Sequence, residues 1–133
     1  MPEPVTVEIP VRYRDLDTFS HVNNAVYATY VEEARAAYFD HVLSIPVEEY
    51  SYVTASLTID FRRPVHMTDV VAASAHVTDV GTTSVTMAYE LAVDGELVAT
   101  AETTLVWVDM DSREPDSIPA GIRAAIVEHE GLA

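Results

Sequence analysis

Cysteine and lysine are both absent from this chain of 133 residues. Without cysteine there is no disulfide, no thiolate nucleophile and no zinc site built on thiolates. No apolar run approaches the length of a membrane-spanning helix, and the acidic start, Met-Pro-Glu-Pro, lacks the layout of a signal peptide. The histidines, at positions 21, 41, 66, 76 and 129, are too scattered for a metal site. We therefore expect a cytoplasmic protein with no metal and no membrane partner.

Positive charge is also scarce. Asp and Glu number 22 against 7 basic residues, all of them arginine, and the net charge is −15. Nucleic acid binding is disfavoured because the chain has no basic patch. An acidic surface without lysine is typical of halophiles that accumulate salt, whose carboxylates stay hydrated when molar salt screens their repulsion. The alternative is an acidic protein from a GC-rich mesophile.

In the N-terminal third of the chain, the hydrophobic residues first alternate as in a strand and then recur at helical spacing. Residues 5–13 alternate in the manner of a half-buried strand, and Pro10 on the polar phase indicates an edge strand or a bulge. From Asn24 the spacing becomes helical, with Glu32, Glu33 and Arg35 on the polar side. Asn23 or Asn24 is a good N-cap, and we expect the helix to end near His41.

Strand patterns follow the helix. Alternation over 53–61, 71–77, 85–93 and 97–107 predicts four strands as a meander, with a type I′ hairpin turn at Asp94-Gly95. A short helix is expected within 120–130. The order predicts an α+β fold in which a five-stranded antiparallel sheet wraps around one long helix. We expect one domain over 1–133, with its core at about 5–109 and a C-terminal tail.

The segment from Tyr13 to Tyr30 carries most of the functional information. It places Asp17 and His21 in a polar turn between the first strand pattern and the helix. A carboxylate beside a helix N-terminus can act on a carbonyl group that the free N–H groups of the helix polarise. No other segment combines so many reactive groups with such a defined backbone setting.

Two stretches of the sequence carry a family resemblance. Asp15-Leu-Asp17, His21-Val-Asn-Asn24 and Tyr27, followed by Tyr30-Val-Glu-Glu-Ala-Arg35, resemble the hotdog-fold thioesterases of the 4-hydroxybenzoyl-CoA thioesterase-like family. Asp60-Phe-Arg-Arg-Pro64 with Asp69 is a second, weaker similarity. The resemblance extends from about residue 5 to residue 109.

The resemblance implies hydrolysis of an acyl-CoA thioester without a cofactor, in a site at the interface of a homodimer or homotetramer. Asp17 corresponds to the catalytic carboxylate, either as the nucleophile or as the base for water. The backbone N–H of Asn24 would hold the thioester oxygen. Asp17 could instead only form an Asx turn, and Asn23 and Asn24 could only cap the helix. His21 could assist proton transfer or orient Asn23, Asp17 or a loop carbonyl.

Other side chains are candidates for substrate binding. Tyr27 is the helix tyrosine placed to line a pocket, and Asn23, just before the helix, is a further candidate. Phe19 stands where plant-type acyl-carrier thioesterases have Asn, which argues against an acyl-carrier substrate, and it could cover the acyl pocket. Arg62 and Arg63 are candidates for the phosphates of CoA, although they could instead pair with nearby carboxylates.

Two other functions remain open. One is a hotdog-type acyl-CoA hydratase or dehydratase, because Asp17 with His21 could mimic its acid and imidazole pair. The other is a non-catalytic acyl-CoA binding module.

Overall fold

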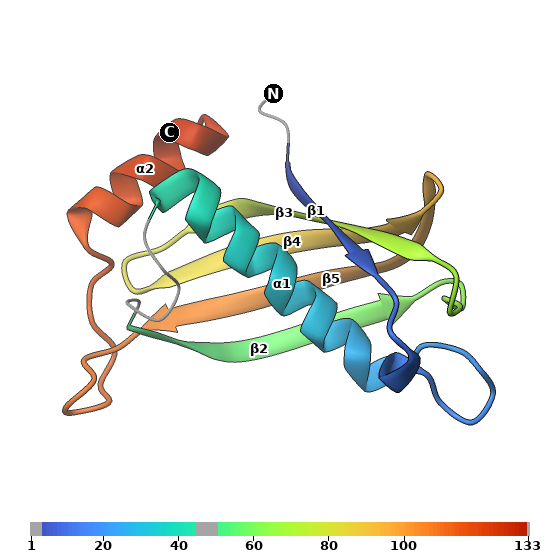
Figure 1. The fold of residues 1–133 in the computed structure, drawn as a ribbon. Coiled ribbons are helices and arrows are strands. Elements are labelled where there is room, and N and C mark those ends of the chain that lie inside the picture. Colours follow the sequence, from blue (N-terminus) through green and yellow to red (C-terminus); the bar gives the residue numbers. More distant parts are fainter. Residues whose placement is uncertain (1–3, 45–50, 133) are drawn as a thin grey trace.

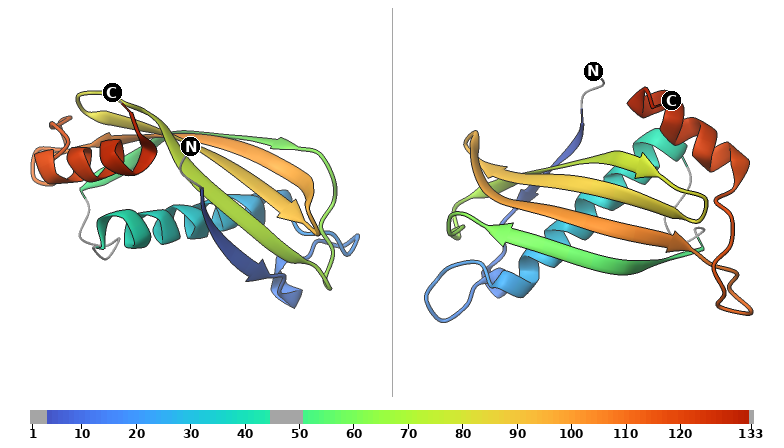
Figure 2. Two further views of the ribbon diagram at one scale, coloured as in Figure 1. Left: turned by 90° about the horizontal axis from the view of Figure 1, so that it is seen from above. Right: turned by 180° about the vertical axis from the view of Figure 1, so that it is seen from behind.

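The computed structural model describes residues 4–44 and 51–132 of the chain (Figure 1). In these residues, helix α1 (Asn24–Leu43) crosses one face of a five-stranded antiparallel sheet. The strands are β1 (Val5–Pro10), β2 (Tyr52–Phe61), β3 (Val70–Val80), β4 (Ser84–Val93) and β5 (Glu96–Trp107). A 3-10 turn, η1 (Tyr13–Asp15), precedes α1, and a second helix, α2 (Ala120–Glu130), follows the sheet. The predicted α+β class is confirmed, and the sheet curves over α1 when seen from above (Figure 2).

The strand order is β1-β3-β4-β5-β2, so the predicted four-strand meander is wrong in its first member. Only β3, β4 and β5 follow one another as hairpins, whereas β2 pairs with β5 at the edge opposite β1. Residues 62–69, which join β2 to β3, exceed the length of a tight hairpin loop. Alternation identifies a strand but does not identify its neighbour, and this is why the sequence misplaced β2.

β2 also departs from its predicted pattern of faces. Its register with β5 shifts between Thr54 and Ser56, where Ala55 is the extra residue of a bulge. Leu57 pairs with the buried Thr103, while Val53 pairs with Val106 on the outer face. A one-residue shift reverses the faces of a strand, so the alternation that runs from 53 to 61 does not lie on one face.

The ends of the elements follow local chemistry. The side chain of Asn23 caps α1 by accepting the N–H of Ala25 at 2.9 Å, as predicted, and Ser44 ends the helix in a left-handed conformation, slightly beyond the predicted His41. β1 is an edge strand, which confirms the interpretation of Pro10. Asp94 and Gly95 both have positive φ, at 51° and 80°, which confirms the primed turn between β4 and β5.

The core lies between α1 and the sheet, and each large apolar side chain buried there contributes about 1.5–3 kcal/mol. From α1 it takes Tyr27, Tyr30, Val31, Ala34, Tyr38 and Phe39, and from the middle strands Val71, Ala73, Met87, Tyr89, Leu91 and Leu105.

Arg35 is a correction to the predicted helix faces. The sequence put it on the polar side of α1, but it is only 9% exposed, and its guanidinium lies 5.7 Å from the centre of the Tyr52 ring. Burial acts to lower its pKa, but the phenol groups of Tyr52 and Tyr89 outweigh burial and raise it. An arginine can cross to the core face because its long stem is apolar and these rings receive its charged end.

α2 closes one end of the layer (Figure 2). Glu130 accepts hydrogen bonds from the N–H of Val77 at 2.7 Å and from the hydroxyl of Tyr38 at 2.6 Å. It thereby ties α2 both to β3 and to α1. Burial, followed by this bond to Glu130, raises the pKa of Tyr38.

Candidate active site

The turn that carries Asp17 is closed by its own hydrogen bonds. Leu16 and Val22 form a β-bridge, and the N–H of Asp17 donates to the carbonyl of His21 at 2.7 Å. Oδ1 of Asp17 accepts the N–H groups of Phe19 at 2.8 Å and of His21 at 3.2 Å. In the part of the chain that the structure describes, no group donates to Oδ2. Oδ1 of Asp17 therefore stabilises the turn, and within the described residues Oδ2 is free to act on a substrate.

The start of α1 lies beside this turn. The N–H of Asn23 donates to the carbonyl of Asp15 at 2.8 Å, and the N–H of Val26 turns back to the carbonyl of Asn23 at 2.9 Å. Among residues 4–44 and 51–132, the N–H of Asn24 has no acceptor, and the first turn of α1 contains no acidic residue. A free amide at a helix N-terminus suits an oxygen on which negative charge develops.

A cleft of about 270 Å³ joins this turn, the start of α1 and the segment after β2. Its lining consists of Asp17, His21, Val22, Asn24, Tyr27, Phe61, Arg62, Arg63 and Pro64. The structure thus brings most of the predicted site residues into one place, although residues 61–64 lie far beyond residues 17–27 in the sequence. Backbone pairing holds the two segments together, since the N–H of Val22 donates to the carbonyl of Val65 at 2.8 Å.

Two predicted residues do not line the cleft. The side chain of Phe19 is 78% exposed, because the bonds to Asp17 place it at the tip of the turn, and it is not among the residues that line the cleft. The side-chain oxygen of Asn23 is occupied as the helix cap.

The imidazole of His21 faces a second histidine and is not directed at the Asp17 carboxylate by any bond in the described residues. Its ring meets that of His66 edge to face, with the centres 5.0 Å apart, and the two residues form a β-bridge. His66 is held in turn by Asp69, whose Oδ2 accepts the N–H of His66 at 2.8 Å and lies 3.7 Å from its Nδ1. In the described residues, the hydrogen bonds between His21 and Asp17 therefore involve the main chain of His21 and not its imidazole.

Tyr27 forms the inner wall of the cleft. It is buried, its ring meets Phe61 edge to face at 4.9 Å, and its hydroxyl lies 3.4 Å from the carbonyl of Arg63, a long contact. Burial raises its pKa, although a backbone hydrogen bond at Val65 opposes this. Tyr27 is thus an uncharged residue of the wall at neutral pH.

Arg62 and Arg63 lie at the outer side of the cleft. The N–H groups of both donate to the carbonyl of Val98, at 2.8 Å and 3.2 Å, and fix their segment to β5. Arg63 pairs with Glu96 at 3.2 Å, but both side chains are mostly exposed, so the pair adds little stability. Within the described ranges, Arg62 forms no ion pair.

Sequence reasoning included Phe61 in the second similarity without giving it a role at the site, and it did not identify His66 as a neighbour of the site. Phe61 was assigned to a strand pattern and occupies the end of β2, where the chain enters the cleft. His66 stands three positions before Asp69, whose side chain accepts the N–H of His66. An Asp at this spacing is typical of a turn, and this was the sequence signal that could have drawn attention to His66. No group of three or more His, Asp or Glu residues in the described ranges could hold a metal ion. None of the described helices is both long and apolar enough to cross a membrane.

The chain is similar to known proteins in sequence and in fold. Residues 11–126 match the model of the family described as the thioesterase-like superfamily. A thioesterase from Thermus thermophilus, solved in complex with coenzyme A and Zn, is 36% identical, with a TM-score of 0.88 over 96% of this chain and 95% of that one.

Two curated proteins are also similar. The long-chain acyl-CoA thioesterase FadM of Escherichia coli (strain K12) is 26% identical over 121 residues, which are 87% of this chain and 92% of that protein. The chloroplastic acyl-acyl carrier protein thioesterase ATL3 of Arabidopsis thaliana is 29% identical over 130 residues, which are 91% of this chain and 66% of that protein.

Proposed function

The chain belongs to the thioesterase-like superfamily, and we propose that it hydrolyses an acyl-CoA thioester to the free acid and CoA, with Asp17 as the acting carboxylate. Its hotdog fold and its relatives make it a thioester hydrolase. One observation carries the choice of residues: the same cleft is lined by Asp17, which has a free carboxylate oxygen, and by Asn24, whose amide is unpaired in the described structure.

The reaction follows from these two groups. The thioester oxygen accepts the N–H of Asn24, and the positive end of α1 stabilises the charge that develops there. Either a water molecule attacks the carbonyl carbon and gives its proton to Asp17, or Asp17 attacks and water then cleaves the anhydride. In both routes the carbon–sulfur bond breaks, and the CoA thiolate leaves and takes up a proton.

His21 supports this reaction by holding the turn. Its main chain donates to Oδ1 of Asp17, while its ring contacts His66. A hydratase would need the imidazole paired with the carboxylate, and the observed contacts favour hydrolysis over that alternative.

Substrate binding is assigned to the walls of the cleft. Tyr27 lines the acyl side, and Arg62 and Arg63 face the phosphates of CoA. Phe19 is exposed beside Asp17, where a bound acyl group or a second protomer would cover it. The acidic composition continues to predict a halophilic protein, and a cytoplasmic location also stays a prediction.

We further propose that the active unit is a homodimer or a homotetramer. The edge strand β2 leaves Val53, Leu57 and Phe61 exposed by 42%, 42% and 47%. An unpaired edge with exposed apolar side chains favours association with a second copy. Because Phe61 also lines the cleft, this association would complete the wall of the site.

The substitution Asp17→Asn tests the mechanism. Asparagine keeps an acceptor oxygen for the turn but supplies neither nucleophile nor base, so we expect kcat to fall by about a thousandfold or more. Release of free CoA thiol is measured over a panel of short and long, aliphatic and aromatic acyl-CoA substrates. The matched control is Asp40→Asn, at an exposed position of α1 outside the cleft, which should retain full activity.

Other outcomes identify the alternatives. Undiminished hydrolysis by the Asp17→Asn variant would show that the mechanism is wrong. Binding of acyl-CoA without turnover by the wild type would indicate a binding module. Addition of water without release of thiol would indicate a hydratase.

A further inference from the structure

A second pocket lies on a different face of the first turns of α1. It has a volume of about 260 Å³ and shares no residue with the Asp17 cleft. Its lining consists of Ile9, Pro10, Arg12, Arg14, Asp15, Val26, Thr29, Tyr30 and Glu33. None of these residues takes part in the proposed hydrolysis, and the pocket therefore needs a separate explanation.

The pocket is bordered by η1, whose backbone is fixed against α1. Asp15 is buried, and its Oδ2 accepts the hydroxyl of Tyr30 at 2.8 Å and the N–H of Arg12 at 3.0 Å. The N–H of Asp15 donates to the carbonyl of Arg12 at 2.8 Å. The turn is thus rigid in its main chain, while the side chains of Arg12, Tyr13 and Arg14 are all exposed to solvent.

These three side chains are exposed, and no ion pair within the described residues holds any of them. Tyr13 is 82% exposed, more than any other large apolar side chain among those described. Arg12 and Arg14 form no ion pair in the described residues, although the chain has 22 acidic residues. The carboxylates in the pocket do not neutralise them by contact, since Asp15 is bonded to the turn and to Tyr30, and Glu33 lies further along α1.

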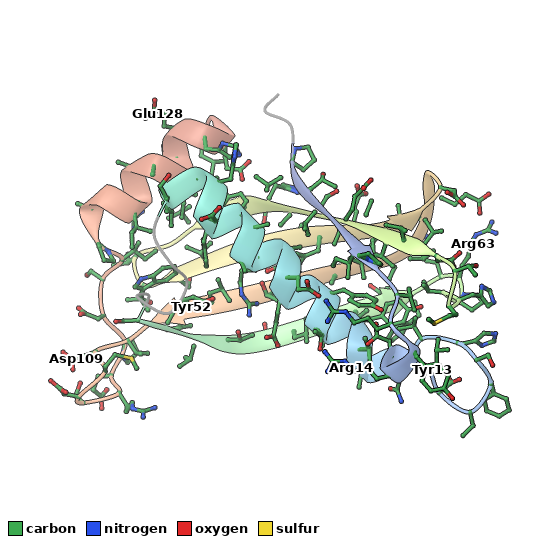
Figure 3. The ribbon with its side chains drawn as sticks, in the orientation of Figure 1. Tyr13, Arg14, Tyr52, Arg63, Asp109 and Glu128 are labelled. Atoms are coloured by element: carbon green, nitrogen blue, oxygen red, sulfur yellow. The ribbon has the colours of Figure 1, made fainter. Side chains whose placement is uncertain are left out.

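The distribution of the 7 basic residues supports an anionic ligand at this end of the molecule. Figure 3 shows Tyr13 and Arg14 near the start of α1 and Arg63 at the same end of the molecule, with Asp109 and Glu128 at the opposite end. Arg35 is buried, and the guanidinium of Arg123 donates to the carbonyls of Gly81 and Thr82. Arg113, whose N–H donates to the carbonyl of Asp109, lies at the opposite end. The other four arginines, Arg12, Arg14, Arg62 and Arg63, line the two pockets beside the start of α1. The positive end of α1 adds to the potential of the arginines that flank it.

We propose that the Arg12-Tyr13-Arg14 turn binds the phosphorylated adenosine end of CoA. The guanidinium groups are suited to phosphate oxygens, and the exposed ring of Tyr13 is suited to stacking on adenine. CoA carries its phosphates and adenine at the end opposite the thioester, and Arg62 and Arg63 supply limited charge because Arg63 is already paired with Glu96. The proposal rests on the proposed function and deepens it.

A truncated substrate distinguishes binding by the Arg12-Tyr13-Arg14 turn from binding at the reaction site. The double variant Arg12→Gln/Arg14→Gln is compared with the wild type on an acyl-CoA and on the same acyl group carried by pantetheine, which lacks phosphate and adenosine. Loss of charge-assisted bonds should raise KM for acyl-CoA about tenfold, with KM for the pantetheine ester and both kcat values unchanged. Tyr13→Ala should raise KM for acyl-CoA about fivefold or more and leave the pantetheine ester unaffected.

The matched control is Arg113→Gln in the loop after β5, which should change neither KM. An unchanged KM for acyl-CoA in the double variant, or an equal rise for both substrates, would overturn the proposal. Titration calorimetry with CoA itself needs no turnover, so it separates a failure here from a failure of the Asp17 mechanism. Weaker binding of CoA by the double variant supports the site, whereas equal binding, or no binding by the wild type, overturns it.

Discussion

The substitution Tyr30→Phe removes one buried hydroxyl and tests how α1 holds the turn that leads into the active site. The hydroxyl of Tyr30 donates to Oδ2 of Asp15 at 2.8 Å, and both residues are buried. Burial, followed by this bond, raises the pKa of Tyr30, so the phenol stays a donor throughout the neutral range. The same Asp15 oxygen accepts the N–H of Arg12, and the Asp15 carbonyl accepts the N–H of Asn23.

The expected magnitude follows from the charge of the acceptor. A hydrogen bond to a charged group contributes about 1.5–3 kcal/mol, and the loss leaves a buried carboxylate with one donor fewer. For a domain of this size that free energy corresponds to a fall in Tm of about 5–12 °C. Asp17 follows Asp15 closely in the same turn, so we also expect a severalfold fall in kcat as the turn loosens.

Urea unfolding at fixed protein concentration measures the free energy of unfolding, because an oligomer makes stability depend on concentration. A cycle with Asp15→Asn isolates the pair, with an expected coupling of about 1 kcal/mol or more. Tyr13→Phe removes the same atom from an exposed tyrosine and should have no effect on stability. A coupling below about 0.3 kcal/mol, or equal losses in Tyr30→Phe and Tyr13→Phe, would refute the reasoning.

Three further predictions concern the turn, the acid range and salt. Gly95→Ala should cost about 1 kcal/mol in urea unfolding because φ is +80° there, whereas Gly121→Ala, in α2 with open space around it, should be neutral or stabilising. Hydrogen bonds from the N–H groups of Ser112 and Asp111 lower the pKa of Asp109. The ionised carboxylate therefore stabilises the folded state above the ordinary carboxyl pKa, and this stabilisation is lost as the pH falls through the lowered pKa. In pH-dependent unfolding, Asp109→Asn should show a smaller loss of stability in the acid range than the wild type. At a net charge of −15, both Tm and thiol release should rise with KCl towards molar concentration, and inactivation in molar KCl would contradict the halophilic prediction.

Local chemistry by itself determined several parts of this protein. The helical spacing after Asn24 and the Asn23 cap set the start of α1, because a cap needs only its own neighbours. The Asp94-Gly95 pair set its hairpin, since few residues accept positive φ at both positions. The Asp17 turn was also visible, because a short polar residue before a helix closes a turn with adjacent N–H groups.

Only the tertiary structure decided which distant segments meet. Period-two alternation is identical for any strand order, so it could not place β2 beside β5, and the bulge at Ala55 reversed its faces without a sequence signal. Arg35 crossed to the core because rings from β2 and β4 receive it there. The cleft is likewise a product of packing: the bond from Val22 to Val65 joins the Asp17 turn to Arg62 and Arg63, and contacts so far apart in the chain have no periodicity to reveal them.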